Sequence, residues 1–240
     1  MRKLNAPGDS VQDVFSTCIE SYRDAALKNR LRSIVPVLSD EASRFEDCVL
    51  TSKTHTIPTA DNVGGVVSKA EMLDIYESKF VKGTGRPYYD KYMSLPTNGK
   101  CPFCGIGTVS TLDHYLPKSK YPALAITPKN MIPACRDCNL GKKRTFSPQN
   151  SEEEPLHPYF DDVEQDIWLS VRFEVAGKEL VPTYFVRKPV AWNDLLFRRV
   201  ENHMVLYNLY TSYAGVQRHA AQRNGGADQA GSAGAAPHQR

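Results

Sequence analysis

Two pairs of cysteines have the spacing of metal ligands. Cys101 and Cys104 form one C-x-x-C pair, and Cys135 and Cys138 form the other. A tight turn between paired cysteines aims both sulfurs at one point, and two such turns complete the tetrahedral thiolate shell that suits Zn²⁺. Four thiolates leave no open coordination position, so we predict a structural zinc ion. Its binding would contribute on the order of 10 kcal/mol to folding of the local unit.

Two other interpretations compete with zinc. A dithiol redox site uses one C-x-x-C pair, not two, and four unrelated core cysteines seldom fall into two such pairs. The remaining cysteines, Cys18 and Cys48, lie on apolar stripes of predicted helices. We expect these two to be ordinary core residues.

The segment between the two cysteine pairs carries further chemistry. Thirty residues separate Cys104 from Cys135, whereas a plain zinc ribbon has about 15–20. This insert contains Asp113 followed directly by His114. Residues 109–112 predict a short strand that delivers these two side chains.

Asn139 directly follows the second cysteine pair and is expected in the first turn of a helix that continues through Lys142 and Lys143. A carboxylate and an amide oxygen converging from a strand end and a helix start suit Mg²⁺ or another divalent cation. A histidine beside that metal can deprotonate water near neutral pH, while the metal stabilises charge on the leaving oxygen. Nearby basic side chains would hold phosphates; they are Lys118, Lys120, Lys142, Lys143 and Arg144.

Each of these residues also has a plain structural interpretation. A lone histidine such as His114 is more often a satisfied core residue, Asp113 could occupy a turn, and Asn139 could cap a helix. Exposed lysines often form nothing more than a solvated face. The pairing of Asp113 with His114 between two zinc knuckles favours the functional interpretation.

The charge distribution points to the same segment. Residues 101–146 carry 7 Lys and Arg against 2 Asp and Glu, whereas residues 1–100 carry 14 against 13 and residues 147–240 carry 9 against 12. Most of the excess positive charge therefore lies in one short central region. An anionic partner would be attracted there.

These residues together resemble the HNH endonucleases, whose ββα-metal site lies in a zinc-stabilised, treble-clef-like scaffold. The resemblance covers residues 101–146. It implies that His114 is the general base and that Asp113 and Asn139 bind the catalytic metal, Asn139 standing where many relatives have a last histidine. It also implies that Asn130 braces the loop and orients the base. Cleavage in that family leaves a 5′-phosphate and a 3′-hydroxyl.

A looser similarity connects residues 112–118 and 157–161 with HNH proteins of bacterial antiviral defence islands, namely Septu-like and retron-associated systems. Such proteins often act beside an ATPase, so the similarity implies an ATPase partner. His157 in the second run could form a late edge of the substrate groove or pack in a proline-containing turn. We favour packing.

The rest of the chain must position this centre. A helical stripe runs from Val11 to Ala26, Pro36 closes it, and a second helix is expected from near Ser39. A capping box at Ser68 begins another helix. After the central unit come an acidic stretch at 152–166, a β-hairpin at 168–186 and a helix at 192–213. We expect an α+β fold divided into a helical region (1–100), the nuclease core (101–146), a hairpin with a closing helix (147–222) and a disordered tail (223–240).

The composition excludes some classes of protein. No stretch of the 240 residues approaches the ~20 consecutive apolar residues of a membrane helix. The start of the chain lacks the apolar core of a signal peptide. We therefore expect a cytoplasmic protein with reduced thiols and no membrane partner.

The sequence predicts metal-dependent hydrolysis of phosphodiester bonds, with DNA as the favoured substrate. The alternative is a non-catalytic zinc module that binds nucleic acid or a protein partner. That alternative requires the cysteines and lysines, but it does not require Asp113 beside His114.

Overall fold

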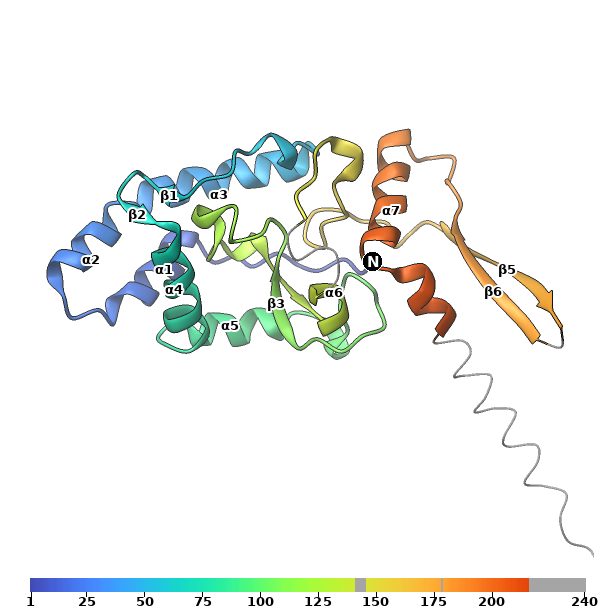
Figure 1. The fold of residues 1–240 in the computed structure, drawn as a ribbon, viewed down its shortest axis with the longest axis horizontal. Coiled ribbons are helices and arrows are strands. Elements are labelled where there is room, and N and C mark those ends of the chain that lie inside the picture. Colours follow the sequence, from blue (N-terminus) through green and yellow to red (C-terminus); the bar gives the residue numbers. More distant parts are fainter. Residues whose placement is uncertain (141–145, 178, 216–240) are drawn as a thin grey trace, which may run out of the picture.

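The computed structural model describes residues 1–140, 146–177 and 179–215, and the fold is α+β, as predicted. Figure 1 shows the N-terminal helices at one end, the central residues in the middle, and α7 with the β5–β6 hairpin at the other end. The short elements are β1 (Asn62–Val63), β2 (Val67–Ser68), η1 (Thr54–Thr56), η3 (Thr97–Gly99), η4 (Pro122–Leu124), η5 (Pro128–Asn130) and η7 (Ser151–Glu153).

Three helices open the chain: α1 (Val11–Glu20), α2 (Ala25–Arg32) and α3 (Val35–Leu50). The single stripe predicted from Val11 to Ala26 is therefore interrupted after Glu20. The sequence predicted that Pro36 closes a helix. In the structure it lies in the first turn of α3. Proline is tolerated there because the first turn has no intrahelical partner for its missing N–H.

The capping box at Ser68 is present and begins α4 (Lys69–Asp74). The same stretch continues as a π-helix, η2 (Ile75–Val81), before α5 (Arg86–Met93). A π-helical turn is rare and is frequently found at functional sites. Ile75, Tyr76 and Phe80 of η2 are buried.

The centre consists of β3 (Thr111–His114), β4 (Met131–Ala134) and α6 (Arg136–Leu140). The two strands are antiparallel, with Asp113 opposite Ile132 and His114 opposite Met131. The predicted strand over 109–112 is displaced, because Asp113 and His114 belong to the strand itself. The predicted continuation of α6 through Lys142 and Lys143 lies outside the described residues.

The predicted hairpin is confirmed as β5 (Leu169–Ala176) and β6 (Glu179–Val186), which project from the body in Figure 1. The following helix, α7 (Asp194–Leu206), is capped by Asn193 and ends earlier than predicted. Asn208 has a φ of 53°, a left-handed conformation that interrupts the helix, and the backbone is helical again over 209–215. The tail at 223–240 lies outside the described residues.

Two apolar clusters form the core. One joins the cysteines to α7 and the end of α3, and the other joins the N-terminal helices to β3 and β4. Leu112 of β3 and Met131 of β4 belong to the second cluster, so the central strands pack directly on the helical region. Within the described residues, none of the helices has the length and apolarity needed to cross a membrane.

Candidate functional site

The four paired cysteines lie together and fit a zinc ion. All four are buried, and their sulfur atoms lie within 4.8 Å of one another. The Sγ atoms of Cys104 and Cys135 are 3.8 Å apart. Zn–S bonds of about 2.3 Å in a tetrahedron place sulfurs roughly 3.8 Å apart. The donor set and its dimensions therefore suit a structural metal such as zinc.

Local hydrogen bonds shape the first knuckle. The N–H of Cys101 donates to the Gly107 carbonyl at 2.8 Å, and the N–H of Gly107 donates to the Cys104 Sγ at 3.3 Å. A Cβ on Gly107 would lie 2.7 Å from the Cys135 Sγ. Only glycine therefore lets the two knuckles approach this closely without a shift.

The second knuckle lies where β4 gives way to α6. Cys135 follows β4, and Cys138 lies in α6, whose residue 139 donates its N–H to the Cys135 carbonyl at 3.1 Å. Hydrogen bonding with Cys101 lowers the pKa of the Cys104 thiol and lowers the pKa of the Cys135 thiol to about 7. Hydrogen bonding within the same cluster raises the pKa of the Cys101 and Cys138 thiols. A lowered thiol pKa favours the thiolate that metals bind.

The C-terminal helical segment secures the first knuckle from outside. The Nε2 atom of His203 lies 2.9 Å from the Phe103 carbonyl, and the Tyr213 hydroxyl donates to the Cys104 carbonyl at 2.9 Å. The Phe103 and Tyr207 rings stack with centroids 4.6 Å apart. His203 has no informative neighbours in sequence, and only the fold shows this structural role.

A separate cleft of about 480 Å³ collects most of the predicted catalytic residues. Asp113 and His114 line it from β3, Asn139 from α6, and Lys118 from the following turn. Residues of α4, η2 and α5 form the facing wall: Leu73, Tyr76, Glu77, Val81 and Tyr89. Residues from Leu73 to Leu140, which belong to the helical region and to the central strands and helix, thus line one cleft.

His114 is held in a defined orientation. It is 8% exposed, and its Nε2 atom lies 2.8 Å from the Ala125 carbonyl. Because a carbonyl only accepts, Nε2 carries a proton, and in the neutral ring Nδ1 is the basic nitrogen. The Tyr76 ring meets the His114 ring edge-on, with centroids 4.8 Å apart.

Asp113 and Asn139, the predicted cation ligands, both line this cleft. Asp113 is 7% exposed, whereas Asn139 is partly exposed. Mg²⁺ commonly binds one or two carboxylates and keeps several waters, so one carboxylate and one amide in an open cleft are chemically suitable. Three or more His, Cys, Asp or Glu side chains could together hold a metal. Among the described residues, the four cysteines are the one such group.

Asn130 braces the loops behind the cleft. It is fully buried, and its Oδ1 atom accepts a hydrogen bond from the Leu116 N–H at 2.8 Å. Its Nδ2 atom donates to the carbonyls of Leu116 and Leu124 at 3.1 and 3.0 Å. Since Leu116 lies two residues beyond His114, this amide fixes the chain that leaves β3.

The predicted phosphate-binding residues separate into three groups. Lys118 lines the cleft, where its ammonium group pairs with Glu77 and lies 4.1 Å from the Tyr76 ring centroid. Lys120 lines a different cleft. The other three predicted residues lie outside the described residues; they are Lys142, Lys143 and Arg144.

His157 is packed rather than placed at a groove. It is fully buried, accepts the Tyr159 N–H on Nδ1 at 3.2 Å, and lies 3.1 Å from the Lys129 carbonyl through Nε2. The rings of Phe45, Tyr115 and Phe160 surround it. The structure thus agrees with the packing interpretation favoured from the sequence.

Sequence reasoning missed the facing wall of this cleft, in which Tyr76 contacts His114 and Glu77 pairs with Lys118. Tyr76 belongs to the apolar stripe of its helix and carries no local sign of a role beyond the core. Glu77 is its neighbour in the π-helix η2, and both residues line the same cleft. No spacing in the sequence indicates this, because the partners lie about forty residues away.

Two known proteins are similar to this chain. It is 28% identical over 227 residues to protein ea31 of Escherichia phage lambda, which covers 89% of this chain and 75% of the phage protein. It is 31% identical over 102 residues to the Septu protein PtuB of Bacillus thuringiensis. That match covers 40% of this chain and 38% of PtuB, so it spans well under half of either protein.

Other comparisons give no match. No protein-family model matches the chain. No solved structure is significantly similar to it. The chain therefore has partial similarity to a Septu protein and a buried four-cysteine centre suited to zinc.

Proposed function

We propose that this protein is a metal-dependent HNH endonuclease that hydrolyses phosphodiester bonds in DNA. The observation that carries the proposal is the common cleft lined by Asp113, His114, Lys118 and Asn139. The buried four-cysteine centre lies next to it in the chain, since Cys138 belongs to the metal centre and residue 139 to the cleft. The proposed catalytic unit is residues 101–146.

His114 is the proposed general base. Its contact with the Ala125 carbonyl keeps the proton on Nε2, so Nδ1 can accept a proton from the attacking water. Asn130 fixes the loop beyond β3 through three hydrogen bonds and so limits movement of the base. Holding the base in one geometry lowers the entropic part of the barrier.

Asp113 and Asn139 are the proposed ligands of Mg²⁺ or a similar divalent cation. When bound, such a cation stabilises negative charge on the phosphate and the leaving oxygen. Lys118 lies on the same cleft and would attract the phosphate. Its present partner, Glu77, is a carboxylate that a substrate phosphate would have to displace.

The partial similarity to PtuB, a Septu protein, supports a role in antiviral defence. It agrees with the resemblance of residues 112–118 to HNH proteins of defence islands. A defence effector must be restrained in the host, and an ATPase partner would supply that control. Purification of the chain from its host should then recover an ATPase, and recovery of the chain alone would contradict this part of the proposal.

The second candidate function is a non-catalytic zinc module that binds nucleic acid or protein. The four-cysteine centre favours it equally, because that centre serves both functions. The cleft distinguishes the two, since a binding module does not need an aspartate, a histidine and an asparagine around one space.

Plasmid nicking by wild type and His114→Ala tests the choice. We expect cleavage by wild type in Mg²⁺ or Mn²⁺ and a loss of at least a hundredfold in the variant, the usual size of general-base catalysis. Zinc content and thermal unfolding should be equal in the two proteins. Equal cleavage, or no cleavage by wild type with any divalent cation or partner, would favour the binding module.

A further inference from the structure

A second cleft adjoins the proposed active site. Its volume is about 500 Å³, and Ser119 lines both clefts. Its wall is formed by the loop after α3, the start of α4, the turn after β3 and the chain from residue 147. The polar residues that line it are His55, Thr59, Asp61, Lys69, Ser119, Lys120, Tyr121, Ser147 and Gln149.

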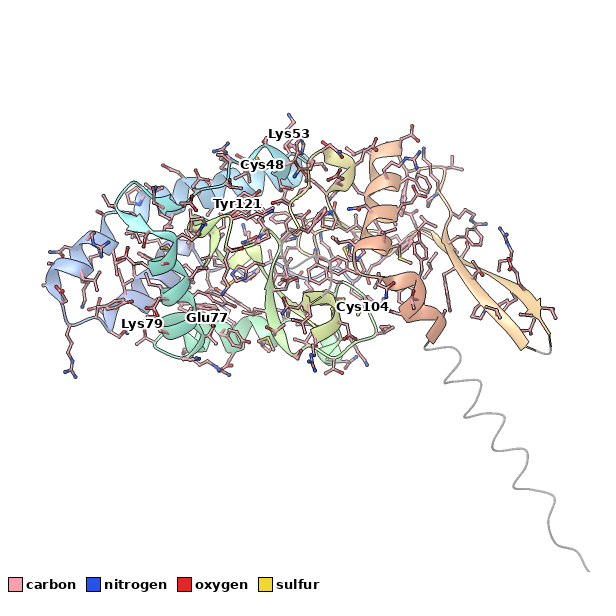
Figure 2. The ribbon with its side chains drawn as sticks, in the orientation of Figure 1. Cys48, Lys53, Glu77, Lys79, Cys104 and Tyr121 are labelled. Carbon is pink, nitrogen blue, oxygen red and sulfur yellow. The ribbon has the colours of Figure 1, made fainter. Side chains whose placement is uncertain are left out.

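One tight turn carries a lysine into each cleft. The N–H groups of Lys120 and Tyr121 both donate to the Pro117 carbonyl, at 2.9 and 3.0 Å. Lys118 lines the first cleft and Lys120 the second. Their Cα atoms are two residues apart, so roughly 7.6 Å is the greatest separation possible. Figure 2 shows Tyr121 on the side of α3 and Glu77 on the side of α5.

The charges of the second cleft suit a phosphate. The ammonium group of Lys69 pairs with Asp61, whereas Lys120 has no carboxylate partner among the described residues. Two neutral hydroxyl groups line the cleft as well. The Tyr121 and Ser147 hydroxyl oxygens lie 2.9 Å apart and are hydrogen-bonded to each other. The lining of the second cleft contains one carboxylate, Asp61, and two lysines, Lys69 and Lys120.

A buried carboxylate holds His55 at the edge of this cleft. Glu154 is fully buried, and its Oε1 atom lies 2.9 Å from the His55 Nδ1 and accepts the His55 backbone N–H at 3.2 Å. Because one oxygen of Glu154 contacts both the ring and the backbone N–H of His55, two contacts hold this residue in place. The contact joins residues 99 positions apart, so local spacing in the sequence does not indicate it.

We propose that the second cleft is a subsite for a neighbouring phosphate of the same DNA strand whose scissile phosphate occupies the first cleft. The proposal rests on the proposed nuclease function. Lys120 is its main charge contact, and Lys69 joins it by exchanging Asp61 for phosphate. Continuity through Ser119 favours an extended strand over a small free anion, which would need only one of the two clefts.

The test uses Lys120→Ala and the double variant that combines Lys69→Ala with Lys120→Ala. The control is Lys188→Ala. Lys188 is a matched control, because it pairs with Asp194 as Lys69 pairs with Asp61 and both lysine side chains are 36% exposed. Binding of labelled single-stranded and duplex DNA is measured by fluorescence anisotropy across a salt series without added divalent cation. Cleavage at saturating DNA is then measured in Mg²⁺.

The salt dependence gives the expected result. Loss of two phosphate contacts should lower the slope of log affinity against log salt by about 1.4 for a single strand. Lys188→Ala should leave the slope unchanged. Cleavage at saturating DNA should stay at the wild-type rate in Lys188→Ala, because Lys188 lines neither cleft.

The outcomes separate this proposal from the nuclease proposal. The subsite would be overturned if Lys120→Ala and the double variant bind DNA with unchanged affinity and unchanged salt dependence. If these variants also cleave normally, the nuclease proposal still stands. Lysine-dependent binding by a protein that never cleaves would support the cleft as a nucleic-acid site and overturn the nuclease. Absence of DNA binding by wild type would overturn the subsite directly.

Discussion

The four-cysteine centre and the proposed catalytic cleft are neighbours built in opposite ways. The centre takes its ligands from two short turns, is buried, and offers no position beyond its four sulfurs. The cleft takes its side chains from β3, α6 and the π-helix η2, and it is open to solvent. A sealed metal stabilises a fold, whereas an open site leaves room for water and substrate.

This difference has a consequence for mutations. Changes at the cysteine centre should reduce the free energy of unfolding, because zinc binding and local folding are one process. Changes in the cleft should reduce cleavage and leave the fold largely intact. Residues between the two, such as Asn130, should affect both properties.

The largest effect is expected for Cys135→Ser. The variant should lose zinc and, with it, on the order of 10 kcal/mol of local folding free energy. Metal analysis and circular dichroism of the purified protein measure the two losses. Cys48→Ser is the control, since Cys48 lies outside the four-cysteine centre. This variant should retain zinc. A well-folded Cys135→Ser protein without zinc would contradict the structural role of the four-cysteine centre.

Asn130→Ala should have the next largest effect. It leaves three buried backbone groups without their partner. At about 1–3 kcal/mol for each group, the free energy of unfolding should fall by about 3–9 kcal/mol. Denaturant titration measures this loss. A stable Asn130→Ala protein that fails to cleave would move Asn130 from the scaffold to the chemistry.

Gly107→Ala tests how tightly the knuckles pack. The new Cβ would lie 2.7 Å from both the Cβ and the Sγ of Cys135. We expect a loss of about 1–3 kcal/mol in the free energy of unfolding, the usual cost of overpacking, and weaker zinc binding in a chelator competition. Gly8→Ala is the control because nothing lies within 4 Å of its added Cβ. Equal zinc affinity in both variants would contradict the close approach.

The smallest effect is expected for Tyr76→Leu in the cleft wall. The Tyr76 ring contacts His114 and lies under Lys118, and aromatic contacts of this kind contribute about 0.5–1.5 kcal/mol. Cleavage at saturating DNA should therefore fall roughly three- to tenfold. Burial raises the pKa of the Tyr76 hydroxyl.

The Tyr76 prediction has its own control. Tyr76→Phe keeps the ring and should restore cleavage, and zinc content should be the same in all three proteins. If the phenylalanine variant cleaves as poorly as the leucine variant, the hydroxyl and not the ring is what the cleft needs.

Local patterns in the sequence predicted several elements well. The capping box at Ser68 and the β5–β6 hairpin were predicted because each depends on residues a few positions apart. Pro36 was misinterpreted because proline both ends helices and occupies their first turn. The π-helix η2 was not predicted, since its apolar stripe resembles that of an ordinary α-helix.

The sequence by itself determined the four cysteines that cluster and the types of residue for the proposed chemistry, because paired cysteines and the Asp113–His114 dipeptide are short-range features. Tertiary structure alone decided which of them share a cleft. It separated Lys118 from Lys120, placed Tyr76 against His114 and paired His55 with Glu154. These contacts depend on how the two apolar clusters pack, and local spacing carries no record of such packing.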